Sequence, residues 1–199
     1  MSKAFLISCF LGGLVLSFIA PLLYRAAWSV FRGTEAWNVL QWVGAPLGTF
    51  FGFCSVLAVI VFIIDMWRSI QDGHARTSPG LAFALLLIPV FNVYWAFQAL
   101  WGLARDYNAY IRRYHVRTPA LPEGLFLTAS ITFSLSYLPK ILRLLGLLID
   151  FAPGGGTLNT VTGSILLVSR LASLANLVII PIIISRGCDA ANAIRQVAA

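Results

Sequence analysis

The hydrophobic pattern divides the chain into five long apolar stretches that alternate with short polar connectors. The stretches cover about residues 4–24, 43–67, 80–102, 124–149 and 161–185. Each approaches the ~20 predominantly apolar residues that a transmembrane helix needs. No connector is long enough for a separate soluble domain, so we expect residues 1–199 to form one membrane domain. The pattern predicts an all-α integral membrane protein, a bundle of four or five transmembrane helices.

The third apolar stretch contains its own interruption, in the sequence Ile88-Pro89-Val90-Phe91-Asn92. Proline lacks an N–H and clashes with the carbonyl four residues before it, so a helix kinks or breaks there. Backbone groups that are freed at membrane depth need a partner, and the short amide of Asn92 can supply one locally. Pro89 and Asn92 therefore predict a helix break. The short apolar arms on each side suit a re-entrant hairpin, and a kinked transmembrane helix fits as well.

The distribution of Lys and Arg bears on this choice, because cytoplasmic loops are enriched in them. With five spans, the better orientation places eight of these residues inside and three outside. With a re-entrant third stretch, Arg25 and Arg32 lie outside and nine residues lie inside: Lys3, Arg68, Arg76, Arg105, Arg112, Arg113, Arg117, Arg186 and Arg195. Both arrangements remain open. Both place the connector 103–122 and the C-terminus in the cytoplasm and the loop 150–160 outside.

The composition supports the membrane class. Of 199 residues, 59% are hydrophobic and 11% are charged, and the mean hydropathy is +0.86, which excludes an ordinary soluble domain. Fourteen Lys and Arg against seven Asp and Glu give a net charge of +7. In a membrane protein such an excess reflects basic cytoplasmic loops. We therefore expect anionic lipid headgroups at the cytoplasmic face as partners, and no nucleic acid.

The segment from Tyr94 to Tyr114 changes from apolar to basic. Its aromatic residues fall at helical spacings before the arginines begin, as in an amphipathic helix that lies in a membrane interface. Trp and Tyr favour the headgroup level, and arginines favour anionic lipid. The predicted anchors at the inner interface are Trp95, Trp101, Arg105, Arg112 and Arg113.

Three cations stand inside apolar stretches, where ionisable residues are costly and mark ligand sites or interhelical pairs. Arg170 lies well within the last stretch, and Lys140 and Arg143 follow Pro139 in the fourth. If all three face one interior, they form a cationic cavity for lipid phosphate or another small anion. A structural pair for Arg170, and snorkelling of Lys140 and Arg143 to headgroups, explain the same residues without a ligand.

Three glycines in the second stretch, Gly44, Gly48 and Gly52, recur at intervals of four. This doubled Gly-xxx-Gly pattern allows two membrane helices to approach backbone to backbone. We expect this helix-packing face to contact another span of the chain or a second subunit.

No catalytic, cofactor or metal motif is present in the sequence. The chain has no Gly-x-Ser-x-Gly elbow, no His-Glu-x-x-His and no phosphate-binding Gly-Lys-Ser loop. Its three cysteines do not resemble a disulfide framework or a metal site. The two histidines, His74 and His115, have no second ligand at a metal-like spacing. We expect no enzymatic activity, no cofactor and no bound metal.

One part of the chain resembles a broad group of bacterial multispan membrane proteins of uncharacterised function. The resemblance rests on Trp67-Arg68 at the end of the second stretch, on Ile88-Pro89-x-x-Asn92, and on Gln98. It covers about residues 45–110, and Tyr94-Trp95 stands where typical members have Arg-Pro. The resemblance implies a location in the bacterial inner membrane and a helix break that is a family feature. It implies no activity.

The sequence therefore predicts a non-catalytic accessory or scaffolding subunit of a bacterial inner-membrane complex, with other membrane subunits or a second copy as partners. The alternative is a lipid or small-anion carrier or channel with a cationic intramembrane site. The two differ at Arg170, because a carrier needs this side chain in a polar cavity.

Overall fold

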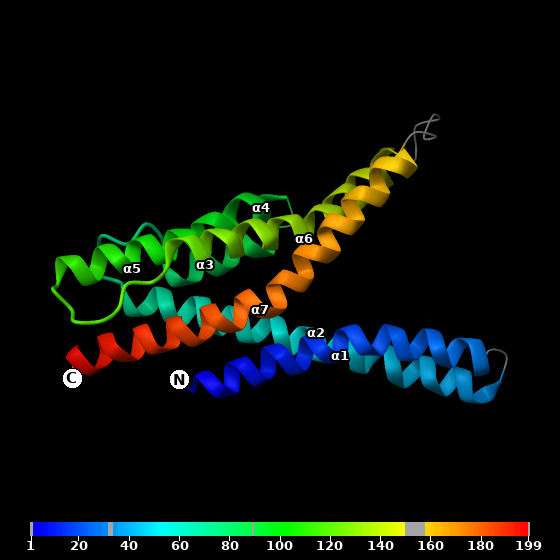
Figure 1. Cartoon of the computed structure of the whole chain (residues 1–199). Coiled ribbons are helices and arrows are strands. Elements are labelled where there is room, and N and C mark those ends of the chain that lie inside the picture. Colours follow the sequence, from blue (N-terminus) through cyan, green and yellow to red (C-terminus); the bar gives the residue numbers. More distant parts are fainter. Residues whose placement is uncertain (1, 32–33, 89, 150–157, 199) are drawn as a thin grey trace. The chain divides into compact units, whose positions relative to one another are not determined.

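The computed structural model describes residues 2–31, 34–88, 90–149 and 158–198, and every regular element in those ranges is helical (Figure 1). The elements in chain order are α1 (Lys3–Phe31), α2 (Glu35–Ser69), α3 (Pro79–Ala84), the 3-10 helix η1 (Leu85–Leu87), α4 (Phe91–Ala96), the π-helix η2 (Phe97–Trp101), α5 (Gly102–Arg113), α6 (Glu123–Ile149) and α7 (Leu158–Ala198). The all-α fold class is thus confirmed.

The chain divides into two compact units, Met1–Phe62 and Ile63–Ala199. In the first unit, α1 and the greater part of α2 lie side by side (Figure 1). The Ser55 hydroxyl donates to the Phe10 carbonyl at 3.1 Å, and Leu6 and Phe10 are buried. A serine hydroxyl that is buried in an apolar environment needs a hydrogen-bond acceptor. Here the acceptor lies on the other helix, so the bond also sets the register between α1 and α2.

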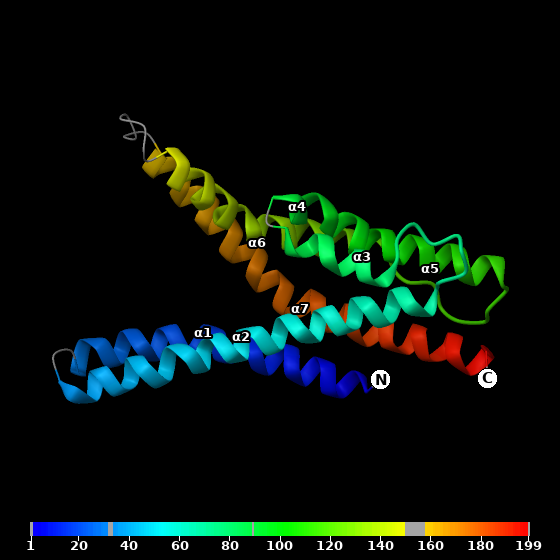
Figure 2. The same ribbon diagram turned by 180° about the vertical axis from the view of Figure 1, so that it is seen from behind.

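The second unit contains a helical hairpin at the place where the sequence predicts an interruption. The first arm, α3 and η1, ends at Leu87, and α4 begins at Phe91 and runs back beside it (Figure 2). Asn92 is buried, and its side-chain amide donates to the Leu86 carbonyl at 3.0 Å. The backbone N–H of Asn92 donates to Ile88 at 2.8 Å. The side chain and the backbone of Asn92 thus donate hydrogen bonds to two carbonyls at the end of the first arm. Pro89 lies outside the described residues.

The hairpin packs on α6 through serine hydroxyls. Ser130 donates to the Ala96 carbonyl at 3.2 Å, and Ser134 donates to the Val93 carbonyl at 3.0 Å. Each hydroxyl shares its single proton with the carbonyl four residues back on α6, which also lies within hydrogen-bond distance. Small side chains permit a close approach of membrane helices, so this face of α6 holds the second arm of the hairpin tightly.

Helices α6 and α7 form an antiparallel pair. The Thr132 hydroxyl donates to Asn176 Oδ1 at 2.6 Å, and the Ser169 hydroxyl donates to the Ser136 carbonyl at 3.2 Å. These two bonds set the register, which places Ser169 level with Ser136 and Asn176 level with Thr132.

The core of the second unit is built around Trp67 near the end of α2. Its side chain is fully buried, and its indole N–H donates to the Ala99 carbonyl of η2 at 3.2 Å. A π-helix leaves the regular hydrogen-bond ladder, and such bulges need local compensation. Trp67 supplies both packing and a donor at this point.

Two stretches of the described residues are long and apolar enough to cross a membrane: Gly52–Ser69 of α2 and Leu167–Gln196 of α7. This agrees with a membrane location.

Candidate functional site

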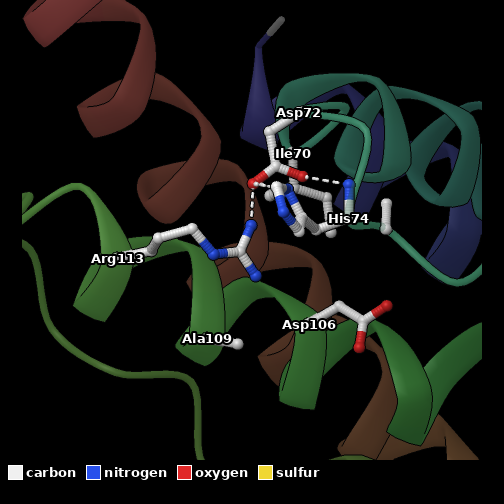
Figure 3. Close-up of a pocket in the computed structure, with 7 residues that line it drawn as sticks. Ile70, Asp72, His74, Asp106, Ala109 and Arg113 are labelled. Atoms are coloured by element: carbon white, nitrogen blue, oxygen red, sulfur yellow. Dashed lines mark hydrogen bonds and ion pairs between the residues drawn. The ribbon is translucent and has the colours of Figure 1, made fainter.

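A cluster of charged side chains in the second unit lies where the link between α2 and α3 meets α5 (Figure 3). Arg113 pairs with Asp72, and Arg76 pairs with Asp106 at 2.8 Å, so two ion pairs join residues that are far apart in sequence. A small pocket opens between them and is also lined by His74 and Ala109. Both flanks of the hairpin therefore lie together at one end of it.

Asp72 is the best-connected carboxylate of this cluster. It accepts the backbone N–H of His74 at 2.9 Å as well as the Arg113 guanidinium. Gly73 turns the link with a φ of 83°, a region that favours glycine. Burial alone raises the pKa of Asp72, but the His74 N–H, the Arg113 charge and the His74 ring together lower this pKa below its usual value. The carboxylate is therefore the form that the site stabilises.

A third pair, Asp65 with Arg195 at 2.6 Å, joins the end of α2 to the end of α7. The carboxylates of Asp65, Asp72 and Asp106 are thus neutralised by arginines of the same chain. Apart from Arg170 in the apolar part of α7, the described arginines that are exposed outside these pairs are Arg68, Arg105, Arg112, Arg117 and Arg186. The outward charge of this end is therefore basic, which suits the anionic headgroups predicted as partners.

The five predicted interface anchors occupy different environments. Trp95 donates its indole N–H to the Ala82 carbonyl at 3.0 Å and stacks on Phe91, so its donor is satisfied inside the hairpin and not by a headgroup. The Arg105 guanidinium lies over the Trp101 ring, 5.0 Å from its centroid. Both side chains suit the membrane–water interface. Arg112 is exposed, whereas Arg113 is held by Asp72.

Of the three cations of the predicted cavity, the structure describes the side chain of Arg170 alone, which is exposed on α7. Within the described ranges no hydrogen bond or ion pair of this guanidinium is found. Lys140 and Arg143 lie in α6, and their side chains are outside the described part of the structure.

The predicted glycine face is described only at Gly52, where an added Cβ meets no atom within 4 Å. Gly44 and Gly48 also lie in α2, and their surroundings are outside the described residues.

Some organising residues were not predicted from the sequence. The serines of α6 are the main example, and their signal was available in the polar alternation of "TASITFSLS" at 128–136. Among the described residues, no group of three His, Cys, Asp or Glu side chains is arranged to hold a metal ion.

Comparison with protein-family models, with curated proteins and with solved structures found no match for this chain.

Proposed function

We propose that this chain is a non-catalytic subunit of a bacterial inner-membrane complex. In this proposal α1, α2, α6 and α7 cross the membrane, and α3 to α4 form a re-entrant hairpin that enters from the cytoplasmic side. Both termini then lie in the cytoplasm. The bacterial inner membrane follows from the resemblance of residues 45–110 to bacterial multispan proteins.

The length of the hairpin supports the re-entrant arrangement. The six residues of α3 and the three of η1 rise together by about 15 Å. This is half of the ~30 Å hydrocarbon core, so the hairpin is too short to cross and long enough to reach the middle. The ion pairs between the 70–78 link and α5 hold its two flanks at one end. The count of nine inner to two outer Lys and Arg agrees.

Labelling with a membrane-impermeant maleimide tests this topology. In a background without Cys9, Cys54 and Cys188, we expect His74→Cys and Arg112→Cys to react only from the cytoplasmic side, because both side chains are exposed at the same end of the hairpin. Thr34→Cys, at an exposed position just before the start of α2, is the control and should react only from the outside. Reaction of the first two positions from opposite sides would show a full third span instead.

The proposal that this chain is a subunit of a complex rests on one observation. Arg170 lies within an exposed apolar stripe of α7. Leu167, Leu171, Leu174 and Val178 are each 50–63% exposed and are spaced by four, three and four residues. This spacing presents one helix face, as in helix–helix interfaces. A purely lipid-facing surface would not carry an unpaired guanidinium, because charge in hydrocarbon is costly. The face is therefore best explained as a contact for another membrane protein.

The carrier alternative receives less support, because it requires Arg170 in a polar cavity. The side chain is instead exposed on the surface of the helix.

Tryptophan substitution tests the proposed face, since lipid-facing positions tolerate a large side chain and packed positions do not. We expect Leu171→Trp and Leu174→Trp each to remove most of the complex that native nanodisc extraction and mass measurement detect for the unchanged protein. Ile131→Trp on α6 is the matched control, because Ile131 is also exposed and apolar but lies outside the stripe. A monomer for the unchanged protein, with no effect of either substitution, would refute the proposal.

A further inference from the structure

Arg170 lies at the level of the hairpin tip. It follows Ser169, whose hydroxyl bonds to the Ser136 carbonyl of α6. Two residues earlier on α6, Ser134 bonds to Val93, near the start of α4. Arg170 therefore lies on α7 at about the depth that the tip reaches, in the same unit of the chain.

In the membrane arrangement proposed above, on which this step rests, that depth is near the middle of the bilayer. The tip stands about 15 Å from the hairpin base, half of the hydrocarbon thickness. Arginine side chains near the ends of spans can snorkel to the headgroups. From the middle, phosphate is distant on both sides, so a counter-charge supplied by protein is favoured.

The chain itself holds no carboxylate at this level. The sequence has no Asp or Glu between Glu123 and Asp150, which covers α6, or between Asp150 and Asp189, which covers the relevant part of α7. The carboxylate nearest the apolar part of α2, Asp65, pairs with Arg195. A second copy of the chain would bring the same residues, so contact between two α7 stripes would place two cations together.

We infer that Arg170 docks a transmembrane helix of a different protein, one that carries a single Asp or Glu near its middle. The apolar stripe packs along this helix, and the carboxylate accepts hydrogen bonds from the guanidinium. The two opposite charges then neutralise each other within the bilayer. Because the pair forms only when the two groups lie at the same depth, it sets the register of the interface and selects the partner.

A designed peptide serves as the test partner. The full-length protein is reconstituted in phosphatidylcholine vesicles with a labelled Leu-rich transmembrane peptide that has one central Glu, and energy transfer measures association. Control peptides have a central Leu, or the Glu moved by seven residues toward one end. We expect the central-Glu peptide to bind about five- to thirty-fold more tightly than either control. Arg170→Gln should abolish this preference, and Arg170→Lys should retain part of it.

The other variants separate the possible failures. Leu174→Trp should weaken binding of all peptides, which tests the stripe independently of the charge. Equal binding of central-Glu and central-Leu peptides to the unchanged protein would overturn the inference, and the subunit proposal would stand if Leu174→Trp still disrupted the native complex. If added phosphatidylglycerol bound in an Arg170-dependent manner and displaced the central-Glu peptide, lipid phosphate would be the occupant and the inference would fail.

Discussion

Replacement of Trp67 by Ala is expected to lower the free energy of unfolding by about 3–5 kcal/mol, the range for deletion of a large buried aromatic side chain. Trp67 is fully buried, and its indole N–H is bonded to the Ala99 carbonyl in the π-helix. The substitution thus leaves a cavity and an unpaired carbonyl at the same place. Titration of the detergent-solubilised protein with SDS, followed by circular dichroism, measures the change.

Two further substitutions separate packing from hydrogen bonding at this position. Trp67→Phe keeps most of the volume but removes the donor, so we expect a loss of about 1–3 kcal/mol. Trp101→Ala is the control from the same π-helix, because Trp101 is only partly buried and faces Arg105. A larger loss for Trp101→Ala than for Trp67→Ala would contradict the core described for the second unit.

The second large effect is expected at Asn108, which closes the connector between α5 and α6. Its amide donates to the Leu121 carbonyl at 2.9 Å and to Glu123 at 3.1 Å, and its carbonyl accepts the Leu121 N–H at 2.8 Å. Asn108 and Leu121 are both buried. Asn108→Ala leaves both backbone groups of Leu121 without these partners, so we expect a loss of about 2–4 kcal/mol in the same unfolding titration.

Asn108→Asp distinguishes the donor from the acceptor. The carboxylate can still accept from Leu121 N–H, but it cannot donate to the Leu121 carbonyl and it repels Glu123. We therefore expect a comparable loss at neutral pH that diminishes on acidification, when the added group is protonated. Arg112→Ala, an exposed change one helical turn further along α5, should alter stability by no more than about 0.5 kcal/mol. An equal loss for Arg112→Ala would indicate that the whole of α5, and not the Asn108 contacts, determines the effect.

The hydrophobic pattern is sufficient to locate the helices. The predicted stretch 124–149 agrees with α6 at Glu123–Ile149, because the apolar run has Pro122 before it and Asp150 after it. Other helices continue past their apolar stretches. Helix α7 extends to Ala198 through Arg186, because a helix needs backbone hydrogen bonds and not apolar side chains to persist.

The break in the third stretch could also be predicted from the sequence, because proline and asparagine act on the backbone next to them. The contacts between residues far apart in the sequence could not be predicted. Nothing in the sequence near Trp95 indicates that its donor meets Ala82 and not a headgroup, and nothing near Asp72 indicates Arg113 as its partner. Such pairings depend on how far the hairpin turns back, which is a property of the folded unit.

A hairpin that reaches only half of the membrane depth, as proposed above, has a consequence for the lipids around the protein. In the proposed orientation, the helices α3 and α4 take up area in the cytoplasmic leaflet and none in the opposite leaflet. The hairpin then displaces lipid from the cytoplasmic monolayer alone, so the second unit takes the place of more lipid there than its two crossing helices do by themselves.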